Sequence, residues 1–363
     1  MTAWRVGLAI KPEKQFGVVD DEEDWHYIGP GLNFNFNENN GWKFQNGVGS
    51  KLPELEYEGR FSGTFGGGTY LDYDNFYWLL FGLEDYTYED TTVTPTGSTA
   101  VSVGKHTFTT SNSKALKSFS LRIIKLDRVV GDSNTPGDEN IILKGCVMNT
   151  FSLAYEATTS AIKVTFNGIF VDTELELSDE SDTGYDDLKP ANFKQVDWGC
   201  LQVKNSAGTG WEAIANNEKT GFTVTRTVTT VPSCGQRIDS AFYESSVQPI
   251  SVTSQIYSRN ANQWQTRMHT GGVRNDIAVG GTSSPRNKGL QPVPDLRIIS
   301  GTEASNSPYS CAVIFKDVVV NSWGNTYTAN SEIVESPTLQ AKSVTIEIIT
   351  KDVTEEIWTE PSS

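Results

Sequence analysis

The chain repeats one arrangement of residues at a constant distance along the sequence. Three groups recur 186 positions later: Gly49-Ser50-Lys51 as Gly235-Gln236-Arg237, Tyr57-Glu58 as Tyr243-Glu244, and Trp78 as Trp264. A further group, residues 120–124, recurs at residues 295–299, an offset of 175. Two copies at so long a period indicate two like domains and not a solenoid of short repeats. With 363 residues, the chain is long enough for two domains that each bury a core.

The repeat also predicts how the chain is divided. We expect a first module at residues 1–176, a second at 192–355 and a C-terminal tail at 356–363. Residues 177–191 between the modules include Ser178-Asp179-Glu180-Ser181-Asp182 and Asp186-Asp187, a composition typical of an exposed linker. A duplicated module that makes the same contact twice favours assembly into a closed ring.

Several segments alternate apolar and polar residues with the period of a β-strand. The apolar sets are Phe119, Leu121 and Ile123; Phe151, Leu153 and Tyr155; Phe222 and Val224; and Val344, Ile346 and Ile348. The residues between them are mostly polar, so one face of each strand should be buried. Together with 32 glycines and 14 prolines for turns, the pattern predicts an all-β fold with a minor α component.

Two segments have the helical period instead, one in each copy. Residues 72–83 form an apolar stripe that begins at a possible N-cap, Asp72, and ends at a possible terminator, Gly82. This helix is apolar nearly all round, so it should be covered on more than one side, and Phe76 and Trp78 are candidate contacts to a neighbouring subunit. The second helix, at residues 260–269, carries Trp264, which is given the same role.

Charge and cysteine usage exclude several classes of protein. The formal net charge of -16 opposes tight binding to phosphate, so non-specific binding of nucleic acid is not expected. The four cysteines, Cys146, Cys200, Cys234 and Cys311, are too scattered for a disulfide framework and are interpreted as free thiols of a protein made in a cytoplasm. The N-terminus lacks the apolar core of a signal peptide, and no apolar run is long enough to cross a membrane.

No motif that carries chemistry is found. The three histidines, His26, His106 and His269, lie far apart in the sequence, and no cysteine pair has zinc spacing. Gly66-Gly67-Gly68 lacks the lysine of a phosphate-binding loop and is interpreted as a bulge or turn that leads into the helix. The acidic clusters at 20–24, 84–90 and 179–187 lack the spacing of a calcium loop. We therefore predict no catalytic residue, no metal and no cofactor, and a protein that is not an enzyme.

The order of these elements resembles a known family. The order includes Gly7-Leu8-Ala9-Ile10-Lys11, a Gly-Ser-Lys turn at 49–51, a strand at 54–65, the 72–83 helix and a strand at 118–125. It continues with Gly145-Cys146-Val147-Met148-Asn149 and a strand at 162–171. Over most of its length the chain is similar to the tail tube proteins, or major tail proteins, of long-tailed phages and related viruses.

The resemblance implies a structural virion protein. Each copy is expected to be a tail-tube-like β-sandwich or barrel module with one flanking helix, and inner sheets of neighbouring subunits join into a barrel. A double-module protein is expected to form a trimeric ring with pseudo-six-fold symmetry, and rings stack into the tail tube of the virion. Genome DNA passes through an acidic lumen without specific binding. The implied partners are further copies of the chain, the tape-measure protein and other tail proteins.

Four glutamates are candidates for the lumen surface. Glu54, Glu56 and Glu58 project on one face of a predicted strand, and Glu244 occupies the matching place in the second copy. Three carboxylates on one strand face repel one another, which a wide aqueous channel tolerates better than a packed interface does. The alternative is an ordinary solvated strand face.

Contacts between rings are assigned to the loop at 38–52, which resembles the stacking loop of the family. Trp42 and Phe44 would bury against the next ring, since aromatic anchors usually dominate the energy of interfaces. Lys51 and Arg237, at the two repeated turns, are included as contact residues. The alternative is that Trp42 and Phe44 fold back onto their own module.

Two other classes of protein remain open at this stage. A two-domain carbohydrate-binding or adhesin β-sandwich is supported by 9 tryptophans and 13 tyrosines, which can stack on sugars. A β-rich hydrolase with a pair of carboxylates is the third possibility.

Overall fold

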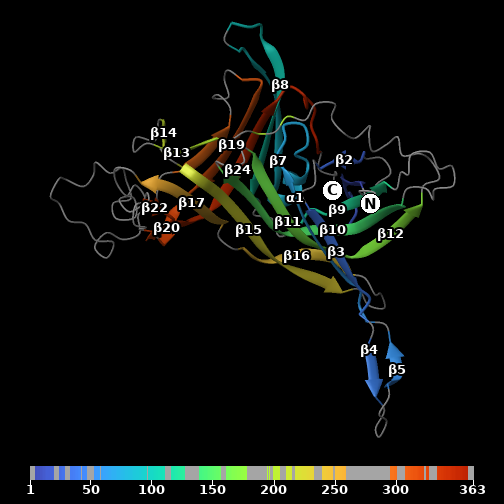
Figure 1. Cartoon of the computed structure of the whole chain (residues 1–363). Coiled ribbons are helices and arrows are strands. Elements are labelled where there is room, and N and C mark those ends of the chain that lie inside the picture. Colours follow the sequence, from blue (N-terminus) through green and yellow to red (C-terminus); the bar gives the residue numbers. More distant parts are fainter. Residues whose placement is uncertain are drawn as a thin grey trace.

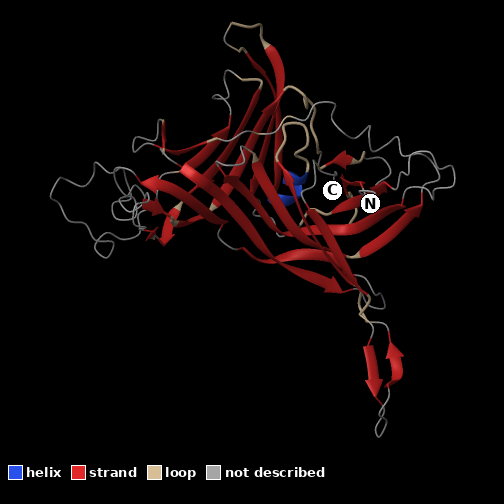
Figure 2. Cartoon of the chain, viewed as in Figure 1, coloured by secondary structure: helices blue, strands red, loops and turns tan. Residues whose placement is uncertain are grey.

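The computed structural model is an antiparallel all-β protein with one short helix (Figures 1 and 2). The structure describes residues 5–19, 24–28, 33–41, 43–46, 53–57, 59–95, 97–110, 116–126, 139–156, 161–177, 194, 196, 199–204, 210–214, 217–232, 239–247, 250–258, 295–300, 307–322, 324–326 and 333–358. The expected all-β fold is therefore confirmed.

The elements follow one another along the chain in two series. The first series is β1 (Arg5–Pro12), β2 (His26–Tyr27), β3 (Asn33–Asn39), β4 (Lys43–Asn46), β5 (Pro53–Tyr57), β6 (Ser62–Tyr70), α1 (Trp78–Leu83), β7 (Glu84–Val93), β8 (Val101–Thr110), β9 (Phe119–Leu126), β10 (Glu139–Glu156), β11 (Ile162–Phe170) and β12 (Asp172–Leu177). The second is β13 (Cys200–Lys204), β14 (Trp211–Ala213), β15 (Asn217–Pro232), β16 (Asp239–Val247), β17 (Ile250–Ser258), β18 (Leu296–Ser300), β19 (Tyr309–Lys316), β20 (Val319–Ser322), β21 (Asn325–Thr326), β22 (Ile333–Glu335), β23 (Thr338–Ala341) and β24 (Ser343–Thr350).

Most strands belong to two large antiparallel sheets. The main path of the 15-stranded sheet is β2-β1-β9-β10-β15-β17-β22-β21, and the 7-stranded sheet has the order β14-β13-β18-β19-β24-β8-β7. The long strand β10 bridges two regions, because its first part pairs with β9 and β12 and its second part pairs with β11 and β15. Both large sheets thus contain strands from both halves of the chain.

The predicted alternation of buried and solvent-facing residues is confirmed in the central strands. Phe151, Leu153 and Tyr155 are at most 1% exposed, whereas Ser152 and Ala154 between them are partly exposed. One continuous cluster of buried side chains contains these residues together with Phe222 and Phe315 from the second half. The helix α1 lies against β10, β7 and β8, so it fills the space between the two sheets.

The helix is shorter than the sequence predicts. It begins at Trp78 and not at Asp72, whose Oδ1 instead accepts a hydrogen bond from the Asp74 backbone N–H at 2.8 Å in a turn. The amides before the helix are committed elsewhere: Leu71 N–H donates to Ile162 O at 3.0 Å, and Tyr73 N–H donates to Lys194 O at 3.1 Å. These tertiary hydrogen bonds hold the backbone around Asp72 in a β-bridge, so this segment is extended and not helical. The helix ends at Leu83, beyond Gly82, and the second predicted helix at 260–269 lies outside the described residues.

The prediction for the triple glycine is wrong. Gly66, Gly67 and Gly68 lie inside the regular strand β6, between β3 and β11, and not in a turn. A Cβ on Gly67 would lie 3.0 Å from ring atoms of both Phe34 and Phe166. Glycine is needed because side chains of both neighbouring strands lie across it.

The two series of strands pair in the same order. In the first, β1 pairs with β9, β9 with β10, β10 with β11 and β12, β11 with β6, and β6 with β3. In the second, β13 pairs with β18, β18 with β19, β19 with β24, β20 with β23, β23 with β17, and β17 with β15. The proposed linker begins at the end of β12, and its residues 178–191 lie outside the described part, so the exact division into modules stays a prediction.

Candidate assembly surface

A closed junction joins the two series of strands inside one chain. The second part of β10 pairs with the first part of β15, from Thr150 opposite Thr225 to Glu156 opposite Lys219. Across this junction Leu153 faces Phe222, and both side chains are at most 2% exposed. The rings of Phe151 and Phe222 meet edge to face at 5.8 Å. The junction is therefore sealed by paired backbone groups and by apolar side chains on its inner face.

The strand β3 has an open edge, whereas β15 pairs with β10 on one side and with β17 on the other. β3 pairs with β6 on one side, and no described strand pairs with its other side. Phe36 lies 186 positions before Phe222 and faces Phe65 on β6, as Phe222 faces Val252 on β17. Phe36 is partly exposed, whereas Phe222 is 2% exposed. The difference follows from the missing neighbour of β3.

A second open edge lies at the other end of the same sheet. β20 and β21 pair with β23 and β22, and the described part of the chain offers no strand for their outer side. Figure 1 shows β20 and β22 on one side of the molecule, and β3 and β12 on the other. β3 and β12 lie together, since the Thr173 hydroxyl donates a hydrogen bond of 2.6 Å to Glu38. Open edges invite pairing with another chain.

A buried ion pair locks the two series of strands together beside the closed junction. Arg226 on β15 donates hydrogen bonds to the carbonyl oxygens of Phe81, at 3.1 Å, and of Gly82, at 2.6 Å, at the C-terminal end of α1. Its Nη1 also lies 3.1 Å from Oε1 of Glu84, and both side chains are at most 6% exposed. Arg226 thus satisfies helix carbonyls that have no partner within the helix.

Burial controls the protonation of Glu84. Loss of solvent raises the pKa of the Glu84 carboxyl to about 7, although Arg226 opposes that shift. The Oε1 atom is within ion-pair distance of Arg226 but has no hydrogen bond of good geometry. The backbone of Glu84 has φ of 79°, an unusual value for a residue other than glycine. The ion pair of Arg226 with Glu84, called the Arg226–Glu84 clamp below, is therefore energetically costly, and the surrounding packing must maintain it.

We expect Glu84→Gln to remove a pH dependence of stability. The folded-state pKa of about 7 lies above the ordinary value of 4.5, so the folded state binds more protons than the unfolded state between these values. The free energy of unfolding of the wild type should therefore fall as pH rises through that window. Glu84→Gln should match the wild type near pH 5 and exceed it near pH 8 by on the order of 2 kcal/mol.

Urea unfolding at the two pH values measures this difference. Glu89→Gln changes an exposed glutamate of the same strand and serves as the control. A Glu84→Gln variant that loses equal stability at both pH values would show that Glu84 acts only as the ionised partner of Arg226.

The predicted lumen and stacking residues are only partly described. Glu54 and Glu56 lie on β5 and Phe44 lies on β4, in a two-stranded hairpin that extends away from both large sheets (Figures 1 and 2). Glu244 on β16 is partly buried, and burial raises the pKa of its carboxyl against the effect of Arg226. The remaining predicted site residues, Trp42, Lys51, Glu58, Arg237 and Trp264, lie outside the described residues.

Phe76 and Trp78 are not available as contacts to a neighbouring subunit. Both are 0% exposed within the single chain. Trp78 donates from Nε1 to Asn75 O at 3.0 Å and packs on Phe151, while Phe76 packs on Phe108 of β8. The sequence correctly indicates a helix covered on several sides. The cover comes from the chain's own β8 and β10, because the 7-stranded sheet closes over α1.

Sequence reasoning missed a polar face on the 15-stranded sheet. The exposed side chains on the face opposite the core are mostly uncharged amides and hydroxyls, and Lys163 and Lys219 are exposed on the same face. The uncharged ones include Asn33, Asn35, Asn37, Thr64, Asn167, Thr225 and Thr253. The alternating Asn-x-Asn of 33–37 and Thr-x-Thr of 223–227 was the available signal. Uncharged polar groups predominate on this hydrated face.

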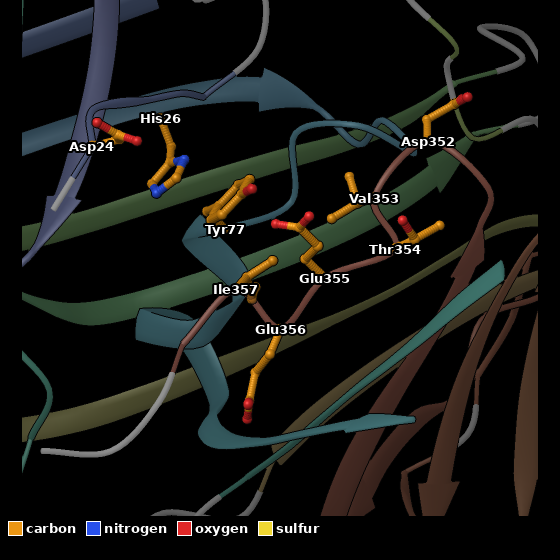
Figure 3. Close-up of a pocket in the computed structure, with 9 residues that line it drawn as sticks. All are labelled: Asp24, His26, Tyr77, Asp352, Val353, Thr354, Glu355, Glu356 and Ile357. Carbon is orange, nitrogen blue, oxygen red and sulfur yellow. The ribbon is translucent and has the colours of Figure 1, made fainter. Parts of the chain in front are cut away.

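One polar pocket lies under the C-terminal segment at 351–358 (Figure 3). It has a volume of about 390 Å³, and the carboxylates of Asp24, Asp352, Glu355 and Glu356 line it together with the stacked rings of His26 and Tyr77. These carboxylates are exposed. Within the described ranges, no three His, Cys, Asp or Glu side chains converge closely enough to hold a metal ion. The pocket therefore suggests no chemistry beyond attraction of cations.

The segment over that pocket is held by the first half of the chain. His106 on β8 is 0% exposed, and its Nε2 lies 2.9 Å from Val353 O, while its Nδ1 lies 3.0 Å from the Tyr86 hydroxyl. That hydroxyl also accepts a hydrogen bond from Ile357 N–H at 3.1 Å. Burial lowers the pKa of His106, which favours the neutral ring that this arrangement needs. The C-terminal segment thus reinforces the pairing of β24 with β8.

In the part of the chain that is described, no helix is both long and apolar enough to cross a bilayer. The sequence matches no protein-family model and no curated protein.

Proposed function

We propose that this chain is a structural subunit that polymerises through the open edges of its larger sheet, as the tail tube protein of a long-tailed phage or related virus. One observation carries the proposal. The chain already contains one junction of the required kind, β10 with β15, and it has the two halves of a second such junction at its opposite ends. In the repeated pairing order, β20 and β21 correspond to the second part of β10, and β3 corresponds to β15.

Head-to-tail pairing follows from this correspondence. If β20 and β21 of one copy pair with β3 of the next, every copy repeats the internal junction between molecules. An interface of this head-to-tail type either closes into a ring or continues as a filament. Closure pairs these two open edges, which in an isolated protein would favour aggregation. Three copies, with two modules each, would give a ring of pseudo-six-fold symmetry.

The polar sheet face then lines the bore. Because the apolar face of the 15-stranded sheet packs on the core, ring closure turns the opposite face inward. Most side chains there, such as Asn35, Asn167 and Thr225, carry no charge that would bind DNA phosphates. Lys163 and Lys219 are exceptions, and the net charge of -16 adds an overall repulsion. DNA would pass through without specific binding. Glu54, Glu56, Glu58 and Glu244 remain predicted contributors to an acidic lumen.

The projecting β4–β5 hairpin is proposed as the contact between stacked rings. It extends well beyond the two large sheets (Figure 1), so it is placed to reach a second ring. Phe44 lies on it, and Trp42 immediately precedes it in the sequence. Stacked rings would form the tube of the virion, with the subunits made in the host cytoplasm and the tape-measure protein inside the tube.

Electron microscopy of the purified protein tests this function. Rings or tubes with a central hole are the expected result, at subunit concentrations in the micromolar range. A protein that stays monomeric at those concentrations and binds glycans would favour the carbohydrate-binding alternative instead. In the described residues, Tyr243 is the single aromatic side chain among the exposed large apolar residues, which gives little support for stacking on sugars.

A further inference from the structure

We propose that β12 is a second docking edge, which takes residues 259–294 of a neighbouring copy of this chain. The proposal rests on the ring arrangement proposed above and extends it from the edges formed by β3, β20 and β21 to the edge of β12, another strand of the 15-stranded sheet. Its starting point is the exposure of one residue, Leu175, at the centre of β12.

Leu175 has a fully buried counterpart in the second half of the chain. Leu175 faces Ile141 on β10, which in turn faces Ile123 on β9. In the second half, Ile346 on β24 faces Val313 on β19, which faces Ile298 on β18. Ile123 and Ile298 belong to the repeated groups 120–124 and 295–299, which are 175 positions apart. Leu175 and Ile346 therefore hold equivalent places, yet Leu175 is 56% exposed and Ile346 is 0% exposed.

The cover over Ile346 comes from the other half of the chain. β8 pairs with the outer edge of β24 and sets Phe108, which is 0% exposed, opposite Ile346. β7 then pairs with β8, so a two-stranded unit completes the sheet. β12 pairs with β10 alone among the described strands, and its outer edge has no such unit. The exposure of Leu175 therefore follows from a missing cover.

The order of the chain indicates which segment supplies that cover. β7 and β8 come from the stretch between β6 and β9. The matching stretch of the second half, between β17 and β18, is residues 259–294. The β7–β8 unit of the first half docks on β24, in the half of the chain that follows it. By the same rule, residues 259–294 would dock on the module that comes next, which is the first module of another copy. Figure 1 places β17 and β12 on opposite sides of the molecule, which also favours a second copy.

The charges of the two segments are complementary. β12 carries Asp172, Glu174 and Glu176. Residues 259–294 contain five basic residues, Arg259, Arg267, Arg274, Arg286 and Lys288, and one acidic residue, Asp276, in a chain whose net charge is -16. A basic segment in so acidic a chain should favour an acidic edge and help to select the register of docking. The geometry and the charges thus indicate the same partner.

Photo-crosslinking from position 175 tests the inference. The residue is replaced by benzoylphenylalanine, and assembled particles are prepared from an equal mixture of ¹⁴N- and ¹⁵N-labelled chains. Irradiation should yield a crosslinked peptide from residues 259–294, and its mass should show mixed isotopes, because it comes from a second chain. The same replacement at Val18, which is 48% exposed in a turn, should give no crosslink to residues 259–294.

A charge substitution gives a second readout. Leu175→Asp should lower the fraction of assembled protein at least tenfold without altering the thermal unfolding of the monomer, whereas Val18→Asp should leave assembly unchanged. Particles that form but crosslink position 175 to another region, to the same chain or to nothing would overturn the docking of residues 259–294 and leave the proposed tube intact. Failure of the wild type to assemble at all would instead overturn the proposed function and the docking together.

Discussion

Phe36→Lys should yield a folded monomer that no longer assembles. In the single chain Phe36 lies on the open edge strand β3 and is partly exposed, so a lysine there can extend its ammonium group to water. In the proposed ring, the same position becomes equivalent to Phe222, which is 2% exposed and covered by β10. A charge without a partner at such a site costs several kcal/mol, so the assembled fraction should fall at least about 100-fold.

The matched control is Phe36→Leu, which keeps an apolar side chain at the same position and should still assemble. Sedimentation velocity measures the assembled fraction, and circular dichroism with thermal unfolding shows that each monomer is folded. Normal assembly of Phe36→Lys would mean that β3 remains an open edge in the particle, and the proposed junction would be wrong.

Arg226→Met should destabilise the fold more than any other single change considered in this protein. The substitution leaves Glu84 buried without its cationic partner and leaves the carbonyl oxygens of Phe81 and Gly82 without donors. Loss of one partner of a buried ion pair typically costs about 3–5 kcal/mol. The loss should be largest near pH 8 and smaller near pH 5, because Glu84, with a pKa of about 7, is then largely protonated even in the wild type.

The double variant Arg226→Met with Glu84→Gln separates the two contributions. It removes the unpaired charge, so it should recover part of the stability near pH 8, and the residual loss measures the uncapped helix carbonyls. Urea unfolding of the wild type, both single variants and the double variant gives the coupling energy. Equal losses for Arg226→Met at both pH values, with no recovery in the double variant, would show that Arg226 stabilises the fold through the helix carbonyls and packing and not through the charge of Glu84.

The strands were predictable from the sequence because their signal is local. The alternation of Phe151, Leu153 and Tyr155 with polar neighbours depends only on the period of an extended chain, and their burial in β10 follows directly. The division of the chain into two like modules, inferred from the long-period repeat, stays a prediction. The start of α1 was not predictable in this way, since Leu71 and Tyr73 donate to partners distant in the sequence, Ile162 and Lys194.

The features that matter most for assembly depend on tertiary structure. A strand pattern does not show which edge is left open, so the comparison of Phe36 with Phe222 and of Leu175 with Ile346 became possible only once the pairing was known. The Arg226–Glu84 clamp joins residues more than 140 positions apart, and nothing around either residue marks it. Glu54 and Glu56 were correctly expected on a strand, but the single strand expected at 54–65 is wrong, because β5 ends at Tyr57 and β6 begins at Ser62. The place of β5 on a projecting hairpin was not foreseen either.

A cryo-EM map of the assembled particle would test the central claim most directly. Repetition of the internal junction predicts a closed ring in which β20 and β21 of each copy run antiparallel to β3 of the next, in the same pairing that joins β10 to β15 within the chain. A particle in which β3 contacts solvent, or in which β20 and β21 of one copy do not pair with β3 of the next, would contradict it.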